Sequence, residues 1–121
     1  MATIMIVDDM AVFREPIAAC LRRGGHRTIS VVNGKEAMDK LAVERPDLIL
    51  LDLAMPVMDG ATFLRTLREH DEYRDIPVIV LSADSDKASK GQVEAMGNTD
   101  YLLKSRFSLK DLLERANKHL A

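Results

Sequence analysis

The chain has 121 residues, which fits one domain, and 47% of them are hydrophobic although only 4% are aromatic. The formal charge of −2 argues against a nucleic-acid-binding surface that depends on net charge. The single cysteine, Cys20, excludes an internal disulfide, and we expect a small buried side chain in a reducing compartment. Since no apolar run approaches the roughly 18 residues of a membrane span, we expect a cytoplasmic protein that binds neither membrane nor nucleic acid.

Short apolar runs alternate with stretches of helical spacing along the whole chain. The runs are nearly continuous, as in strands that are buried on both faces of a parallel sheet. They lie at Thr3–Val7, Thr28–Val32, Leu48–Leu51, Val78–Leu81 and Tyr101–Leu103. Five strand–helix units predict a three-layer α/β domain, in which helices cover both faces of an open, parallel, five-stranded sheet with right-handed connections.

The helical stretches differ in how clearly they are marked. The first contains Pro16, which we expect to kink the helix or to delay its start. The last has the clearest apolar stripe, and it follows Ser108, an N-cap residue with Asp111 three positions later. The fourth, Asp86–Met96, contains Gly91 and has little apolar face, so we expect a helix of marginal stability.

Polar residues follow four of the five apolar runs. Asp8 and Asp9 follow the first, Asp52 the third, Ser82 the fourth and Lys104 the fifth. The carboxyl ends of parallel strands form the ligand-binding edge of an open α/β sheet, so we expect these side chains to converge. Two carboxylates ~4 Å apart repel by about 4 kcal/mol, and Mg²⁺ is the cation that such oxygen ligands suit. A carboxylate on the central strand is then the candidate nucleophile for an aspartyl phosphate, and the hydroxyl and ammonium groups suit phosphoryl oxygens.

These residues and the stretch Leu51–Gly60 (LDLAMPVMDG) closely resemble the receiver domain of bacterial two-component response regulators, in particular the single-domain chemotaxis regulators. The resemblance covers residues 1–121 and implies one receiver domain with the flavodoxin-like strand order 2-1-3-4-5. It also implies that Asp52 accepts a phosphoryl group from the phosphohistidine of a histidine kinase or histidine phosphotransfer protein. Asp9 and Asp52 would ligate Mg²⁺ directly, Asp8 mainly through water, and the backbone carbonyl of Ala54 would complete the protein ligands.

The same resemblance implies how the phosphoryl group changes the protein. Ser82 and Lys104 would contact the phosphoryl oxygens, and Tyr101 would turn inward as the switch residue. A downstream protein would then read the face formed by the fourth helix, the fifth strand and the fifth helix. Such a protein catalyses its own phosphorylation and dephosphorylation but is not a conventional turnover enzyme.

One departure from the family pattern leaves an alternative open. Lys104 is followed by Ser105, where the family has a proline joined through a cis peptide bond, and a non-proline cis bond costs about 2.5–4 kcal/mol. The alternative is a receiver-like interaction module that is not phosphorylated in use. A phosphatase of the haloacid dehalogenase type is disfavoured, because Asp52-Leu53-Ala54 lacks the second acid of its D-x-D motif. Since no output domain follows Ala121, we expect either a single-domain regulator or a receiver taken from a longer protein.

Overall fold

The computed structural model describes residues 2–52, 60–82, 99–103 and 108–120. Its five strands are all parallel and lie in the order β2-β1-β3-β4-β5, as predicted. The strands are β1 (Thr3–Val7), β2 (Arg27–Val31), β3 (Leu48–Asp52), β4 (Val78–Ser82) and β5 (Thr99–Leu103). Two strands begin earlier than predicted, β2 by one residue and β5 by two, because backbone pairing with the neighbouring strand continues beyond the apolar run.

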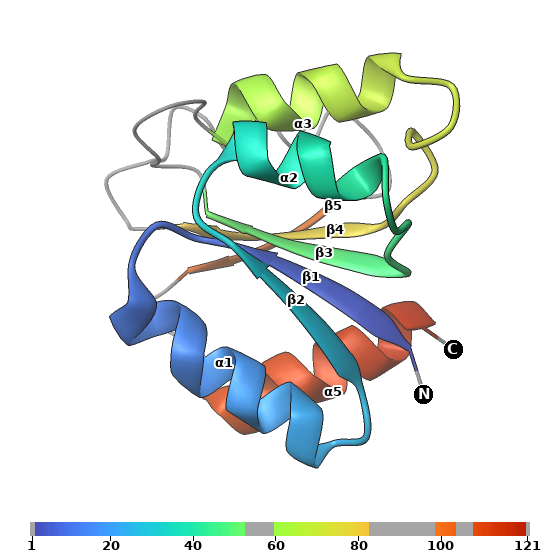
Figure 1. Cartoon of the computed structure of the whole chain (residues 1–121). Coiled ribbons are helices and arrows are strands. Elements are labelled where there is room, and N and C mark those ends of the chain that lie inside the picture. Colours follow the sequence, from blue (N-terminus) through green and yellow to red (C-terminus); the bar gives the residue numbers. More distant parts are fainter. Residues whose placement is uncertain (1, 53–59, 83–98, 104–107, 121) are drawn as a thin grey trace.

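Helices cover both faces of this sheet and make the predicted three layers. The described helices are α1 (Ala11–Arg23), α2 (Gly34–Leu41), α3 (Gly60–Glu69) and α5 (Leu109–Leu120). Figure 1 shows α2 and α3 over one face and α1 and α5 over the other. The helix predicted at 86–96 lies outside the described residues. In the described part of the chain, no helix is long and apolar enough to cross a membrane.

Two apolar clusters hold the layers together, because successive side chains of a strand point to opposite faces. In β1, Met5 and Val7 pack toward α2 and α3, whereas Ile4 and Ile6 pack toward α1 and α5. In β3, every residue is buried. The continuous apolar runs of the sequence are therefore explained by a sheet that is covered on both sides.

The first helix runs unbroken through Pro16, so the prediction that this proline delays the helix start is wrong. Proline lacks the N–H that would donate to the carbonyl of Val12, and both residues are exposed, which lets water bond that carbonyl. The helix is held instead by the burial of Ile17, Ala18 and Leu21 against the sheet.

The last helix begins as predicted. The Ser108 hydroxyl accepts a hydrogen bond from the N–H of Asp111 at 3.1 Å, and the carboxylate of Asp111 accepts one from the N–H of Ser108 at 3.2 Å. The prediction for Cys20 was only partly right: the thiol is half-buried and lies 3.6 Å from the carbonyl oxygen of Leu109, where α1 contacts the start of α5.

Candidate functional site

The register of the sheet brings the predicted acidic residues together. Val7, the last residue of β1, is paired with Leu51 of β3, so the next residues of the two strands, Asp8 and Asp52, lie level with each other. Asp9 follows in the short loop that joins β1 to α1. The three carboxylates therefore lie at the carboxyl ends of two adjacent central strands, as the sequence predicts.

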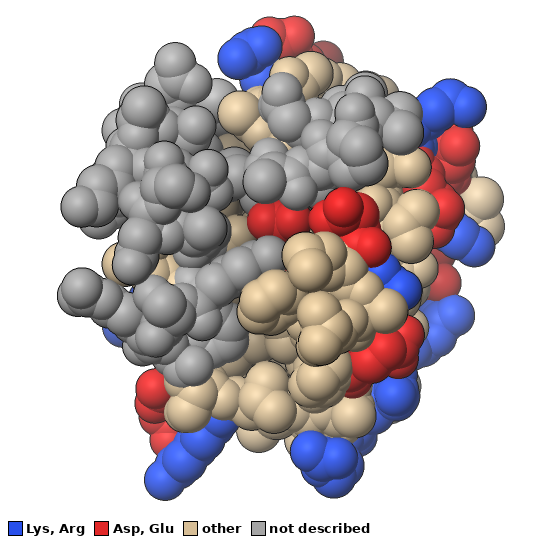
Figure 2. Space-filling model, turned by 90° about the vertical axis from the view of Figure 1, so that its left-hand side faces the viewer, with Lys and Arg blue, Asp and Glu red and all other residues tan. Residues whose placement is uncertain are grey.

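These three side chains, which we call the acidic triad, form a compact cluster. One carboxylate oxygen from each of Asp8, Asp9 and Asp52 lies within 4.8 Å of the others. Asp8 and Asp52 are only 2% and 4% exposed and are the two buried polar or charged residues of the described chain, whereas Asp9 is exposed. Figure 2, which looks onto this edge of the sheet, shows acidic side chains gathered near the centre of the face.

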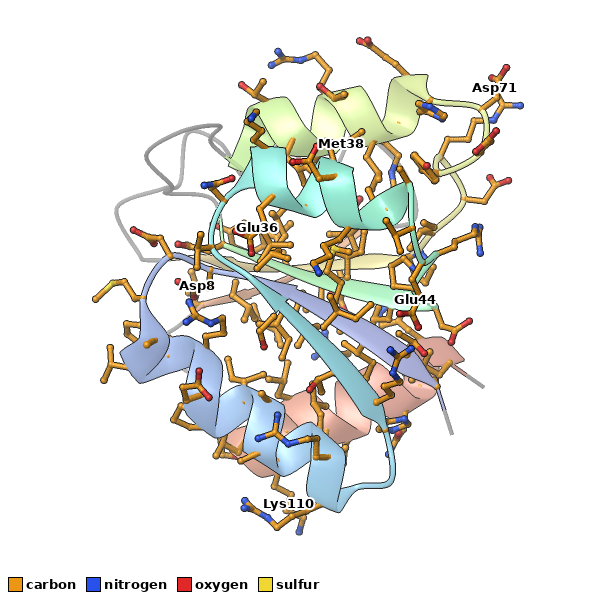
Figure 3. All side chains as sticks on the ribbon, in the orientation of Figure 1. Asp8, Glu36, Met38, Glu44, Asp71 and Lys110 are labelled. Carbon is orange, nitrogen blue, oxygen red and sulfur yellow. The ribbon has the colours of Figure 1, made fainter. Side chains whose placement is uncertain are left out.

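The backbone and side chain of Asp8 are held by neighbours from three directions. Its N–H donates to the carbonyl of Val31 at 3.1 Å, which extends the pairing of β1 with β2. Its Oδ1 accepts from the N–H of Met10 at 2.9 Å, and its carbonyl oxygen accepts from Nη1 of Arg14 at 2.7 Å. The labelled Asp8 lies where β1 turns into α1 in Figure 3, so these contacts determine the shape of that turn.

The oxygen donors of the acidic triad fit the cation predicted from the sequence. Mg²⁺ takes oxygen ligands and is usually held by one or two carboxylates together with water and phosphate oxygens. The triad offers carboxylate oxygens without nitrogen or sulfur, and partial exposure on the side of Asp9 leaves access for water. Because the carboxylates repel one another at this separation, a divalent cation would relieve an unfavourable charge cluster.

The structure places two other predicted site residues and leaves two outside its described part. Ser82 ends β4, and its neighbour Leu81 is paired with Asp52, so the backbone of Ser82 lies at the same edge as the triad. Tyr101 lies on β5, half-buried, against the apolar cluster on the α2 and α3 side. Ala54 and Lys104, together with the altered loop after Lys104, lie outside the described residues.

Apolar side chains border the triad on the α1 side, a feature that the sequence reasoning missed. Met10, Val12 and Phe13 are 47%, 70% and 38% exposed, and they follow the acidic pair directly. These are three of the five large hydrophobic residues that are exposed in the described chain. The apolar run Met10–Phe13 is visible in the sequence, but the sequence alone does not show that three of its side chains remain exposed beside the acidic residues.

A second polar cluster lies on β5 and α5, and the sequence reasoning missed it as well. Oδ2 of Asp100 lies 2.7 Å from Nη1 of Arg115 and 3.0 Å from Nε2 of His119, and Oδ1 accepts from the N–H of Tyr101. Burial by itself would raise the pKa of Asp100, but the hydrogen bonds from His119, Arg115 and Tyr101 and the charge of Arg115 outweigh it and lower the pKa.

Two of the three histidines make side-chain contacts between residues that are far apart in the sequence. His119 is half-buried in the cluster around Asp100, and Nε2 of His26 lies 2.8 Å from Oδ1 of Asn117 in an exposed contact between the start of β2 and α5. Only His70 is exposed, stacked on Tyr73. Residues so far apart in the sequence give no local pattern that would reveal these contacts.

Comparison with known proteins assigns the chain to a family. The sequence model of the response regulator receiver domain matches residues 4–117. The chain is 37% identical over 113 residues to the phosphate regulon transcriptional regulatory protein PhoB of Pseudomonas aeruginosa, covering 93% of this chain and 49% of that protein. It is also 37% identical over 106 residues to the polar-differentiation response regulator DivK of Brucella anthropi, covering 84% and 83% of the two chains.

The solved structures agree with this assignment. The Vibrio cholerae chemotaxis protein CheY4 superposes with a TM-score of 0.89 at 30% identity, and the match covers 99% of both chains. The chain spans about half the length of PhoB, but most of the length of DivK and CheY4. The chain therefore belongs to the response regulator receiver domain family of two-component signalling.

Proposed function

We propose that the chain is a phospho-acceptor switch in which Asp52 receives the phosphoryl group. The observation that carries this proposal is the acidic triad, in which a buried carboxylate at the end of a central strand lies within 4.8 Å of two others. Of the three, Asp52 is the residue that belongs to β3, the middle strand of the sheet, with a strand end on either side of it. A nucleophile in that position lies beside the carboxyl ends of β1 and β4, and the proposal adds Lys104, which follows β5 in the sequence.

The proposed reaction moves a phosphoryl group from nitrogen to oxygen. A carboxylate oxygen of Asp52 forms the new O–P bond while the N–P bond of a donor phosphohistidine breaks, and the leaving imidazole nitrogen takes up a proton. Mg²⁺, when bound by Asp9 and Asp52 directly and by Asp8 through water, would lower the repulsion between the phosphoryl oxygens and the triad. The Ala54 carbonyl is the further protein ligand in this proposal.

In this proposal, the response to phosphorylation takes place on the β4 and β5 side of the site. The added group brings about −1.5 to −2 charges, which Lys104 and the Ser82 hydroxyl would contact. Tyr101 already packs against the apolar cluster on the α2 and α3 side of the sheet, so a further inward movement of its ring would change the surface near β5. A downstream protein would bind the face that includes β5 and α5, and it would distinguish the two states only by its different affinity for each.

The proposed donor is a protein histidine, carried by a histidine kinase or a histidine phosphotransfer protein. Asp52 is 4% exposed, so a protein donor must press against the rim of the site to bring its imidazole close enough. The described rim includes Met10, Val12 and Phe13, whose exposed apolar surface suits contact with another protein. In this proposal the chain acts as a signalling switch and not as a conventional turnover enzyme.

Phosphorylation by a small donor tests the chemistry without a partner protein. We expect acetyl phosphate and Mg²⁺ to add one phosphoryl mass to the wild type, as measured by intact-protein mass spectrometry, and EDTA to prevent it. Asp52→Asn should abolish the added mass. Asp71→Asn removes a carboxylate that is 90% exposed and lies outside the triad, so it should leave the reaction unchanged.

The alternative function is an interaction module that keeps the fold but is not phosphorylated. The sequence difference that favours it is Ser105 in place of the family's proline after Lys104. The alternative replaces the switch proposal if the folded wild type gains no phosphoryl mass from acetyl phosphate and Mg²⁺. It must also gain none, in the presence of Mg²⁺, from a panel of phosphorylated histidine phosphotransfer domains.

A further inference from the structure

We propose that Arg14 is a positioning residue for the acidic triad. Its guanidinium holds the backbone carbonyl of Asp8 and thereby sets the turn that presents Asp8 and Asp9 to Asp52. The inference rests on the proposed function of the triad as a Mg²⁺ and phosphoryl site, and it assigns a role to a residue outside the set of ligands and reacting groups.

The geometry of the contact is specific. Arg14 lies in the first turn of α1, and its side chain, only 13% exposed, reaches back across the three-residue turn to the end of β1. The distance of 2.7 Å from Nη1 to the carbonyl oxygen of Asp8 is short, as expected for a donor that carries a full charge. The Arg14 side chain therefore connects α1 to Asp8, whose N–H still pairs with the carbonyl of Val31 in β2.

The turn lacks the usual means of holding a helix start. The N-cap residue of α1 is Met10, whose side chain makes no capping hydrogen bond, and the first turn contains no acidic residue. The N–H of Met10 is instead occupied by Oδ1 of Asp8. Arg14 links the helix to the loop in a different way from a Ser or Asp cap, because it donates to a loop carbonyl instead of accepting from a helix N–H.

The turn must also resist the charges that it carries. Two of the three carboxylates of the triad lie on it, and the third lies on β3, so mutual repulsion pushes the turn away from the strand. A bond to the carbonyl of Asp8 opposes this movement at the residue where it would begin. We infer that the spacing of the triad depends on this bond more than on the local preferences of residues 8–10.

Stability alone does not account for an arginine at this position. Its Nε is buried and has no hydrogen-bond partner among the residues that the structure describes, although buried polar atoms are nearly always paired. A methionine would fill a similar volume without an unpaired donor. Nη2 of Arg14 lies 3.8 Å from Oε1 of Glu15, whose side chain is exposed, and such a pair contributes little to stability. The guanidinium is therefore best explained by the carbonyl of Asp8, to which its Nη1 atom donates.

Two roles of this arginine predict opposite effects on metal binding. If Arg14 acted only as a counter-ion to the triad, its removal would increase the negative potential and Mg²⁺ would bind more tightly. If it positions the turn, its removal lets the carboxylates spread apart and Mg²⁺ binds more weakly. The contact to a backbone carbonyl, which carries no net charge, favours positioning.

The test measures the dissociation constant of Mg²⁺ alone by isothermal titration calorimetry at constant ionic strength. We expect Arg14→Met to weaken Mg²⁺ binding about tenfold, the low end of the range for groups that orient metal ligands. Arg14→Lys retains the charge and one donor, so its affinity for Mg²⁺ should lie between those of Arg14→Met and the wild type. The matched control is Arg23→Gln, which removes an exposed arginine from the same helix and should bind Mg²⁺ like the wild type.

Each other outcome overturns the proposal in a distinguishable way. Tighter Mg²⁺ binding by Arg14→Met shows a counter-ion, and unchanged binding with a lowered melting temperature shows a purely structural role. Should Arg14→Met fail to fold by far-UV circular dichroism, Arg14→Lys decides the question: an affinity equal to that of the wild type overturns positioning. A wild type that binds no Mg²⁺ overturns the proposed function together with this inference.

Discussion

Asp52→Asn should stabilise the metal-free protein, because it removes one charge from the acidic triad while preserving the size of the side chain. Asp8 and Asp52 are both buried, so their repulsion is only weakly screened. Unit charges 4.8 Å apart repel by about 3.5 kcal/mol at an effective dielectric constant of about 20. Asp9 is exposed, and its repulsion with Asp52 is reduced toward the value of about 1 kcal/mol in water.

The net gain must be smaller than this repulsion. Asp52 takes part in other interactions, which the substitution weakens. We therefore expect an increase of about 1–3 kcal/mol in the free energy of unfolding. For a chain of 121 residues this corresponds to a melting temperature that is higher by roughly 4–12 °C.

The assay is urea and thermal denaturation in EDTA, followed by far-UV circular dichroism, which suits a protein without tryptophan. The slope of the free energy against urea should not change, because the fold is retained. Added Mg²⁺ should then raise the melting temperature of the wild type more than that of the variant, since a ligand stabilises the state that binds it. Asp71→Asn, which alters a side chain that is 90% exposed, should change stability by less than about 0.5 kcal/mol.

Two results would contradict repulsion within the acidic triad. One is an Asp52→Asn protein that is less stable than the wild type in EDTA with an unchanged urea slope. The other is an equal response of both proteins to Mg²⁺. High salt provides a further check, because the gain should survive it if the buried pair of Asp8 and Asp52 is the source.

Two further predictions concern α5 and the strand beside it. The pKa of Asp100 in the folded protein lies below the ordinary value of 3.8. Its ionised carboxylate therefore stabilises the protein fully above pH 3.8, and this stabilisation is lost as the pH falls through the folded-state pKa. Asp100→Asn should therefore lower the free energy of unfolding by about 1–2 kcal/mol at neutral pH, and this difference from the wild type should shrink below pH 3.8. Urea denaturation that gives the same difference at every pH would contradict the prediction. Ser108→Ala should destabilise the protein by about 1 kcal/mol through loss of the N-cap, and Ser108→Asp should restore most of it; equal melting temperatures of Ser108→Ala and wild type would show that the cap adds nothing.

The fold class and the three residues of the acidic triad were predictable from the order of residues alone. Continuous apolar runs at regular intervals require a sheet that is covered on both faces, and parallel strands then bring their carboxyl ends to one edge. Asp8, Asp9 and Asp52 each follow or end such a run, so their convergence was predictable from topology without any contact being known. Local signals also predicted the start of α5, because an N-cap acts over three residues.

The residues that contact the acidic turn and β5 from other elements became visible only in the folded chain. Arg14 is one arginine among many in the sequence, and its contact with the carbonyl of Asp8 depends on the path of the turn between β1 and α1. Asp100, Arg115 and His119 meet because α5 packs back on the sheet, which no local pattern encodes. Side-chain contacts between elements depend on the packing of the whole chain, whereas the periodicity of a strand and the residues at its end are local features. For that reason the sequence predicted the acidic triad but not the residues that hold it in place.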